Sequence, residues 1–235
     1  LTPTFAHSNN PASTSITRNF LDAHLSRAIT MQDLSNELFC CPDCFKAQNP
    51  AKQPCGSLYS ESRFNNDVQM LTRINARFIG RVAGLWGRAK WINQGYFEAT
   101  AKSAKAINTA YAAAGLAQPI IQASIVEKIE PSINTVRIPY EVAKAYNTNV
   151  RNFSYTDMLY AQKHRHNYLE GGKTAVPDIS QQETQMWFYY QATQYIDAGY
   201  EAIHFGQIQI MDDNDPGHQH WWNLLSKIRK YAQNK

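Results

Sequence analysis

The sequence predicts an α/β fold with a barrel-like parallel sheet, and three apolar segments carry that prediction. Residues 78–85, 120–127 and 201–209 each have the length and composition of a buried strand. Helical patterns alternate with them, and a strand, a helix and a second strand in this order form a parallel βαβ unit. Polar side chains stand at the ends of these strands, as they do around the rim of an α/β barrel. We therefore expect one barrel-like sheet with the helices packed outside it.

The first strand, FIGRVAGL at residues 78–85, is followed by an expected helix over residues 96–114. That segment is rich in alanine, the residue with the highest helix propensity. Glu98 stands four residues before Lys102, which places opposite charges on one helix face. Gly115 supplies a stop signal, and we expect the chain to turn there toward the next strand.

The second strand, IIQASIVE at residues 120–127, precedes a connection of some fifty residues. The next helix is expected to begin at Ser180, because SQQE matches a capping box in which Glu183 reaches back to the first residue. That helix continues to Gly199, and the third strand follows over residues 201–209. The order of these elements predicts a second crossover of the same kind as the first.

The two ends of the chain differ in how clearly they predict structure. Residues 218–232 predict a helix, because apolar residues recur there at helical spacing. This inner stripe consists of Trp221, Leu224, Leu225 and Ile228. At the other end, residues 1–19 read as an exposed arm, rich in Ser, Thr, Asn and Pro. Residues 20–25 fit either a strand or a helix, and residues 31–39 predict a helix capped by Thr30.

Length and composition bound the protein class. Residues 20–235 suffice for one α/β domain, but a closed eight-stranded barrel takes about 250 residues with short loops. We therefore expect an incomplete barrel or an open sheet, and a chain that is the front part of a longer protein.

The 43% hydrophobic and 18% charged residues exclude a disordered chain, and no apolar run approaches a membrane span of roughly 18 residues. Lys and Arg are scattered despite a net charge of +4, so we do not expect nucleic acid as a partner. The lack of a long apolar run argues against a membrane partner. We also predict no cofactor.

Four cysteines, Cys40, Cys41, Cys44 and Cys55, lie in one segment, residues 40–55. In an oxidising compartment they would form two disulfides. We rank this above free thiols and above a zinc knuckle, because adjacent cysteines rarely bind one ion together. The chain starts at a leucine rather than a methionine, which suits a mature protein after signal removal. Both observations favour a secreted or periplasmic protein.

The candidate catalytic groups lie on the second and third strands. Glu127 ends the second strand, where a carboxylate faces the mouth of a barrel and can act as an acid or a base. Its alternative role is an ion pair with Lys128 or Arg81. His204 lies inside the third strand, and its ring is either a satisfied core histidine or a donor to a substrate hydroxyl. Both residues therefore have a catalytic interpretation and a purely structural one.

The candidate substrate-binding groups surround these two residues. Gln207 and Gln209 share one face by strand alternation, and their amides can bind sugar hydroxyls or form a polar plug between strand ends. Trp86 and Trp91 follow the first strand, where an indole can stack on the apolar face of a sugar. Arg81 belongs to that same strand, and we expect it to shape the pocket.

An acidic run follows the third strand and contains Asp212, Asp213 and Asp215, with His218 and His220 close behind. These side chains include enough donors for a metal ion. However, DDNDPG lacks the spaced ligands of a calcium loop, and an aspartate before proline is a helix-entry signal, so we favour capping. The two histidines of KHRH likewise read as a solvated loop. Asp213 remains a candidate for substrate binding, and no metal site is predicted.

Taken together, FIGRVAGLWG, IIQASIVEKIEP and YIDAGYEAIHFGQ resemble strand ends of the TIM-barrel glycoside hydrolase superfamily. The resemblance is one of layout and covers roughly residues 75–232. It implies a barrel whose long loops form a sugar cleft with two carboxylates across it. Glu127 matches such a position. The third strand departs from the pattern, because it ends in Gln207 and Gln209 where a second carboxylate would stand.

These observations lead to three functional hypotheses. The first is a secreted carbohydrate-active protein that hydrolyses glycosidic bonds by carboxylate acid/base catalysis. The second is a non-catalytic carbohydrate-binding or structural module on the same fold, in which the glutamines record the missing carboxylate. The third is a metal-dependent enzyme, which requires an ion at the cysteine segment or at residues 212–220. A second carboxylate within about 5 to 10 Å of Glu127 would favour the first hypothesis.

Overall fold

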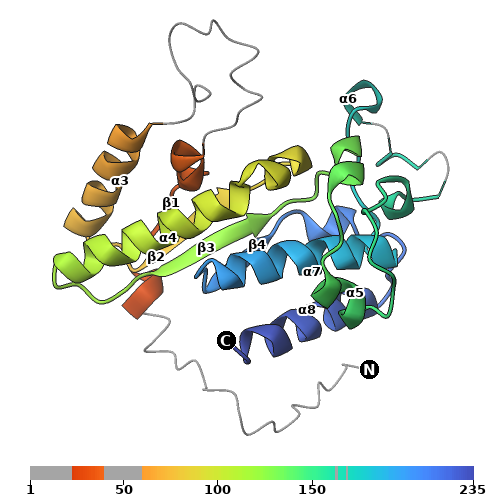
Figure 1. Ribbon diagram of the computed structural model, residues 1–235. Helices are drawn as coiled ribbons and strands as arrows, with labels where there is room; N and C mark the ends of the chain where they lie inside the picture. Colours follow the sequence, from red (N-terminus) through yellow and green to blue (C-terminus); the bar gives the residue numbers. More distant parts are fainter. Residues whose placement is uncertain (1–22, 40–59, 162–163, 168) are drawn as a thin grey trace, which may run out of the picture.

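In the part of the chain that the structure, a computed structural model, describes, four parallel strands form one central sheet (Figure 1). The structure describes residues 23–39, 60–161, 164–167 and 169–235. The strands are β1 (Ala28–Thr30), β2 (Phe78–Gly84), β3 (Ile120–Ile125) and β4 (Ala202–Phe205). They lie in the order β1-β2-β3-β4, the order of the chain, and the described strands do not close into a barrel.

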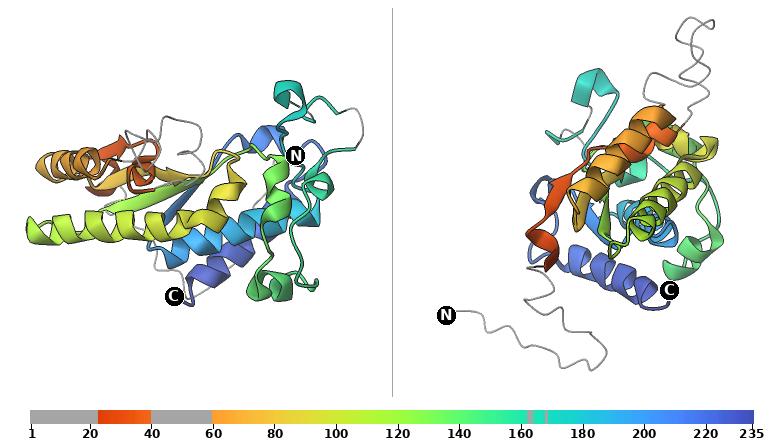
Figure 2. Two further views of the ribbon diagram at one scale, coloured as in Figure 1. Left: turned by 45° about the horizontal axis from the view of Figure 1, so that its top comes forward. Right: turned by 90° about the vertical axis from the view of Figure 1, so that its left-hand side faces the viewer.

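Helices cover the sheet and connect its strands. From residue 60 onward, the described α-helices are α3 (Glu61–Arg73), α4 (Tyr96–Ala113), α5 (Tyr140–Ala145), α6 (Leu169–Gly172), α7 (Gln182–Asp197) and α8 (Gln219–Ala232). The 3-10 helices are η1 (Leu34–Leu38), η2 (Ala89–Gln94), η3 (Pro131–Thr135), η4 (Thr156–Met158) and η5 (Ile208–Ile210). Successive long helices contact one another, α3 with α4, α4 with α7 and α7 with α8. Figure 2 shows α4 and α7 on the same side of the sheet, so the crossovers build one helical layer.

The two best-defined strands and the alanine-rich helix are confirmed. Strands over residues 78–84 and 120–125 pair in parallel, and β3 pairs in parallel with β4. The helix predicted over residues 96–114 is α4, which ends one residue earlier and is followed by Gly115 at a φ of 68°. The predicted parallel βαβ arrangement is therefore correct for all three strands.

The third strand is shorter than predicted, and this corrects the placement of the two glutamines. β4 ends at Phe205, and Gly206 makes the last backbone hydrogen bond to β3, from its N–H to the Ile125 carbonyl at 2.8 Å. The next backbone N–H, that of Gln207, donates to the Glu127 side chain at 3.2 Å instead of to a strand. Gln207 and Gln209 consequently do not share a strand face, because the chain turns into η5.

The predicted helix over residues 31–39 is also wrong. Thr30 lies in β1, and the backbone N–H groups of Met31 and Asp33 continue to donate to β2, at 2.9 Å each. Only η1 forms, with Asp33 at its N-cap in a left-handed conformation. Residues 23–25 are helical. The predicted arm over residues 1–19 and the cysteine segment over residues 40–55 lie outside the described residues.

The predicted capping box at Ser180 does not form, because Glu183 has stronger partners elsewhere. α7 begins two residues after Ser180, and Glu183 is only 4% exposed. Its carboxylate accepts two hydrogen bonds from the Arg151 guanidinium, at 2.8 and 2.7 Å, and a third from the Ser154 backbone N–H at 2.7 Å. Asp178 accepts from the Ser180 N–H in place of the box. Glu183 thus ties the long connection between β3 and α7 to that helix.

The last helix confirms the capping interpretation of Asp215. The buried carboxylate of Asp215 accepts hydrogen bonds from the backbone N–H groups of His220, at 3.1 Å, and Trp221, at 3.2 Å. The first N–H groups of a helix have no carbonyl partner within the helix, and Asp215 supplies an acceptor for these two. The predicted inner stripe is largely correct, since Trp221, Leu224 and Ile228 are buried and Leu225 is half-buried.

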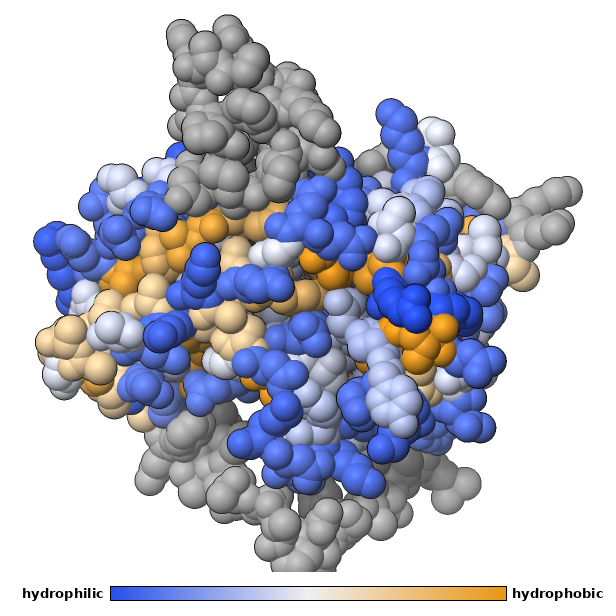
Figure 3. Space-filling model, in the orientation of Figure 1, coloured by the Kyte–Doolittle hydropathy of each residue, from blue (hydrophilic) through white to orange (hydrophobic). Residues whose placement is uncertain are grey.

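The surface is mostly hydrophilic on the face drawn in Figure 3, with apolar surface over α3 and α4 at the upper left. Part of it belongs to the alanine-rich α4, in which Ala106 and Ala110 are partly buried and Ala112 and Ala113 are exposed. None of the helices in the described part of the chain combines the length and the apolar character needed to cross a membrane.

Candidate functional site

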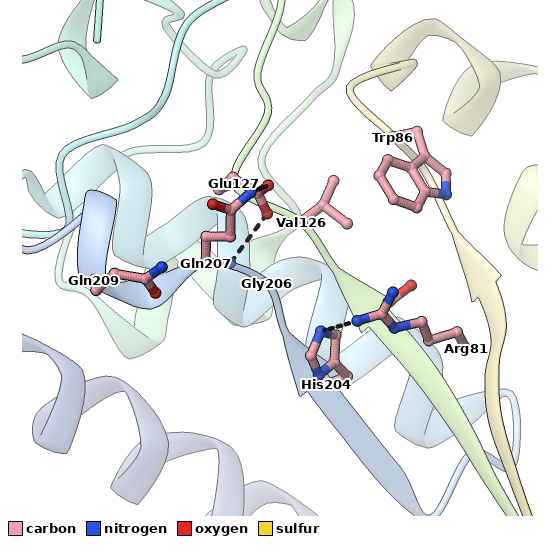
Figure 4. Close-up of a pocket in the computed structure, with 9 residues that line it drawn as sticks. Arg81, Trp86, Val126, Glu127, His204, Gly206, Gln207 and Gln209 are labelled. Carbon is pink, nitrogen blue, oxygen red and sulfur yellow. Dashed lines mark hydrogen bonds between the residues drawn. The ribbon is translucent and has the colours of Figure 1, made fainter. Parts of the chain in front are cut away.

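A cavity of about 410 Å³ opens at the carboxyl ends of β2, β3 and β4 (Figure 4). It is lined by Arg81, Trp86, Ser124, Val126, Glu127, His204, Gly206, Gln207 and Gln209. The sequence predicts most of these residues, from three separate segments of the chain, and misses Ser124, Val126 and Gly206. The volume lies in the range of small-molecule sites, about 300–1,000 Å³.

Glu127 is held in one orientation by Gln207. It follows β3 by two residues, and its Oε1 accepts a hydrogen bond from the Gln207 side-chain amide at 2.7 Å. Its Oε2 accepts from the Gln207 backbone N–H at 3.2 Å. Both oxygens therefore act as acceptors, which is the role of a base or nucleophile rather than of a proton donor. Gln207 orients the carboxylate.

A neutral histidine and an arginine form the floor of the cavity. The Nη2 of Arg81 donates to the Nε2 of His204 at 3.1 Å, across β3. Arginine has no acceptor, so His204 accepts at Nε2 and carries its proton on Nδ1. Burial lowers the pKa of His204, the Arg81 charge lowers it further, and Glu127 only partly opposes them. His204 is thus a neutral N–H donor at neutral pH.

The conformation of β2 aims Arg81 at His204. Arg81 has a φ of 56°, a left-handed value that is uncommon for a residue other than glycine. The pairing of β2 with β3 shifts register between Ile79 and Ala83, on either side of Arg81. Irregularities of this kind are frequent next to active sites, where they redirect a side chain. This backbone irregularity directs the Arg81 guanidinium across β3 toward His204 on β4.

Trp86 forms one wall of the cavity. It follows β2, is 36% exposed, and donates from its indole Nε1 to Asp33 Oδ1 at 2.9 Å. Figure 4 shows the ring on one side of the cavity and Glu127 on the other, with Val126 between them. An indole that is anchored at its polar edge and exposed on its face is a suitable stacking surface.

Trp91 does not line the cavity, which corrects its prediction as a substrate-binding residue. It lies in η2, is 4% exposed, and its ring centroid is 5.0 Å from that of Phe39 and 6.2 Å from that of Tyr96. The Arg88 guanidinium lies 4.5 Å from the centroid of the Trp91 ring. The η2 turn directs this indole into the aromatic core, away from the strand ends.

Asp33 is a second carboxylate at the same edge of the sheet, and it was not among the predicted site residues. It comes just after β1 and lines a second cavity of about 500 Å³, whose wall also includes Trp86. Burial raises the pKa of Asp33, against opposing hydrogen bonds from Trp86 and Gln32 and the charges of Arg88 and Arg81. The only signal in the sequence is an aspartate three residues after the segment AIT, which is too short to show strand periodicity.

The raised pKa of Asp33 predicts a pH-dependent effect of Asp33→Asn. Because the folded state holds this proton more tightly than the unfolded state, ionisation of Asp33 opposes folding once the pH exceeds its ordinary pKa of 3.8. Among the described residues, both hydrogen bonds to the carboxyl group reach Oδ1, which asparagine retains. We expect Asp33→Asn to be at least as stable as the wild type at pH 7. Urea denaturation across pH should show this gain shrinking as the pH falls through the raised folded-state pKa of Asp33 and disappearing below about 3.8.

The matched control for that measurement is Asp157→Asn, because Asp157 is exposed and lies at η4. Because that side chain is exposed, Asp157→Asn should change the free energy of unfolding at pH 7 only slightly. A loss of stability in Asp33→Asn that is largest at pH 7 would contradict the assigned direction of the Asp33 pKa.

Asp213 lies outside the cavity and belongs to a different cluster. Its Oδ2 is 3.3 Å from His164 Nε2, 3.2 Å from Arg165 Nη2 and 3.8 Å from His166 Nε2. The prediction that Asp213 binds substrate therefore gains no support from its position. The two histidines are partly buried rather than fully solvated, with side chains 27% and 13% exposed.

Comparison with protein-family models, with curated proteins and with solved structures finds no match to this chain. No relative therefore suggests a substrate. The chemistry of the cavity is the guide to function: an oriented carboxylate, a neutral histidine paired with an arginine, two amides and an exposed indole.

Proposed function

We propose that the cavity binds carbohydrate and that Glu127 takes part in the hydrolysis of a glycosidic bond. The observation that carries the proposal is the placement of an oriented carboxylate opposite an exposed indole (Figure 4). Sugars present hydroxyl groups to amides and charged groups and an apolar ring face to an aromatic residue. The cavity offers both kinds of surface at once.

Two carboxylates in different environments support hydrolysis over binding alone. Glycosidases use two carboxyl groups about 5 to 10 Å apart, one as proton donor and the other as base or nucleophile. Asp33 follows β1 and Glu127 follows β3, with one strand between them. Two strand spacings separate the backbones of these strands by about 10 Å, and Trp86 lines both the cavity of Glu127 and the adjoining cavity of Asp33. Burial favours the protonated form of Asp33, whose two described N–H bonds both reach Oδ1, whereas the two N–H bonds to Glu127 engage both of its oxygens. We therefore assign Asp33 as the acid and Glu127 as the base or nucleophile.

The topology supports the barrel interpretation that belongs to this proposal. The strand order follows the chain without reversal, and successive helices contact one another. In a doubly wound sheet the order reverses at a switch point, which the described strands do not show. We propose that they represent four consecutive units of a (β/α) barrel, whose active sites lie at the carboxyl ends of the strands.

Trp86→Ala tests the proposed sugar site. If the indole stacks on the ligand, the substitution should weaken binding by about 1–3 kcal/mol, or roughly 5- to 150-fold in Kd. The measurement is calorimetric titration with defined cello-, xylo-, chito- and malto-oligosaccharides. Hydrolysis of the same oligosaccharides by the wild type, followed by chromatography, tests the catalytic part of the proposal.

Trp222→Ala is the matched control, because Trp222 is 53% exposed on α8 and does not line the cavity. It should leave binding unchanged. Equal loss of affinity in both variants, or binding by the wild type that neither variant alters, would place the sugar site elsewhere.

One observation favours a non-catalytic carbohydrate-binding module as the second candidate. Gln207 engages both oxygens of Glu127, and amides rather than carboxylates follow β4. A protein that binds an oligosaccharide through Trp86 but does not hydrolyse it would match this second candidate.

A further inference from the structure

We propose that His164, His166 and Asp213 form a binding site for a divalent transition-metal ion, best matched by Zn²⁺. The two imidazole Nε2 atoms lie 3.3 and 3.8 Å from the same carboxylate oxygen, Asp213 Oδ2. One potential ligand atom from each of the three residues lies within 4.8 Å of the other two. Imidazole nitrogen and carboxylate oxygen are ligands that Zn²⁺ prefers.

The two separations to Asp213 are close to those of a tetrahedral site. Zn–N and Zn–O bonds of about 2.0–2.2 Å at tetrahedral angles place neighbouring ligand atoms about 3.3 Å apart. The His164 to Asp213 distance already has this value, and His166 requires a shift of about half an ångström to match it. Three protein ligands leave a fourth position for water or another small ligand.

Contacts outside the cluster position the histidine segment. The Tyr160 ring stacks on His164 with centroids 4.0 Å apart, and its hydroxyl donates to the Ile210 carbonyl at 3.1 Å. The Asn167 side chain closes the loop by donating to the Tyr160 carbonyl at 2.9 Å. These contacts fix the histidine segment against the segment that leads to Asp213.

Arg165 already places positive charge in the cluster. Its Nη2 lies 3.2 Å from Asp213 Oδ2, and its Nε donates to His166 Nε2 at 3.2 Å. His166 Nε2 therefore carries no proton, and its lone pair becomes available as a ligand once Arg165 leaves it. The Arg165 side chain is 71% exposed and can move into solvent when a metal ion takes its place. Arg165 competes with the metal in this arrangement and is not one of its ligands.

The test uses the full chain, stripped with a chelator and titrated with Zn²⁺ by calorimetry, with elemental analysis after dialysis. We expect one Zn²⁺ at this site per wild-type chain. His166→Gln and Asp213→Asn should each weaken it at least about 10- to 100-fold, the loss typical even of an outer-shell partner. Arg165→Ala should bind Zn²⁺ at least as tightly as the wild type. His218→Gln, which alters the neighbouring pair with Asp212, should have no effect.

A parallel titration with Co²⁺ separates this site from the cysteines, because thiolate ligation gives intense charge-transfer absorption that imidazole and carboxylate ligation does not. Circular dichroism checks that each variant is folded. The proposal is supported if the two ligand variants lose the metal ion and if Co²⁺ bound at this site in the wild type shows no thiolate absorption. Absence of binding in the wild type, or binding that both ligand variants retain, overturns it. Neither outcome depends on whether the protein hydrolyses sugars.

Discussion

Glu127→Gln is expected to lower the hydrolysis of oligosaccharides by at least about 10²- to 10⁴-fold, the usual contribution of an acid or base group. The amide keeps the shape of the carboxylate but can neither accept a proton nor attack the sugar. The affinity for oligosaccharide and the melting temperature should remain nearly unchanged. Initial rates, calorimetric titration and thermal denaturation measure the three quantities on the same preparation.

The hydrogen bonds around Glu127 explain why this variant should fold normally. An oxygen can remain at the Oε2 position, where it still accepts the Gln207 backbone N–H. The new amide nitrogen then faces the Gln207 side chain, which can rotate to present its oxygen as acceptor. A fall in turnover that merely parallels a fall in melting temperature would argue against a catalytic role for Glu127.

Gly206→Ala should have the largest structural effect of any single methyl group in the site. A Cβ at this position would overlap Glu127 Oε2 and approach the Glu127 backbone nitrogen to 3.3 Å. We expect the carboxylate to be displaced from Gln207, at a cost of about 0.5–1.5 kcal/mol in the free energy of unfolding, the size of a typical lost hydrogen bond, because the atom that meets the new methyl group is the end of a side chain that can move. Hydrolysis should fall as far as in Glu127→Gln, and denaturation curves would show the loss of stability.

A double-mutant cycle isolates the cause of that effect. In a Glu127→Ala background the oxygen that meets the new methyl group is gone, so Gly206→Ala should cost much less stability than in the wild type. Equal costs in both backgrounds would mean that the glycine is required for another reason.

The sheet was predictable because its strands and its long helix satisfy local rules. The segments containing Ile79 and Ile121 are apolar and short, and the alanine-rich helix separates them. Glu127 and Arg81 were predictable by position, since the ends of parallel strands meet at one edge of a sheet. His204 followed from the same argument, although its pairing with Arg81 could not be read from the sequence.

The errors share a physical origin in contacts between residues that are distant in the chain. Glu183 fits a local capping box, but a buried carboxylate gains more from the Arg151 guanidinium and a backbone N–H. Asp33 was hidden because β1 is formed by pairing with β2 rather than by its own pattern. Trp91 follows a strand end, yet the intervening turn directs it into the aromatic core.

The irregularity in β2 has a consequence for how the segment tolerates changes in length. From Ile79 to Ala83 the chain advances four residues while its partner strand advances two, so β2 carries two extra residues around Arg81. An even number preserves the alternation of side chains between the faces of a sheet, and an odd number inverts it. Removing one residue here would exchange inside for outside along the rest of β2, whereas removing two would erase the Arg81 bulge and leave the hydrophobic register intact. Insertions and deletions in this segment are therefore constrained by parity as well as by size.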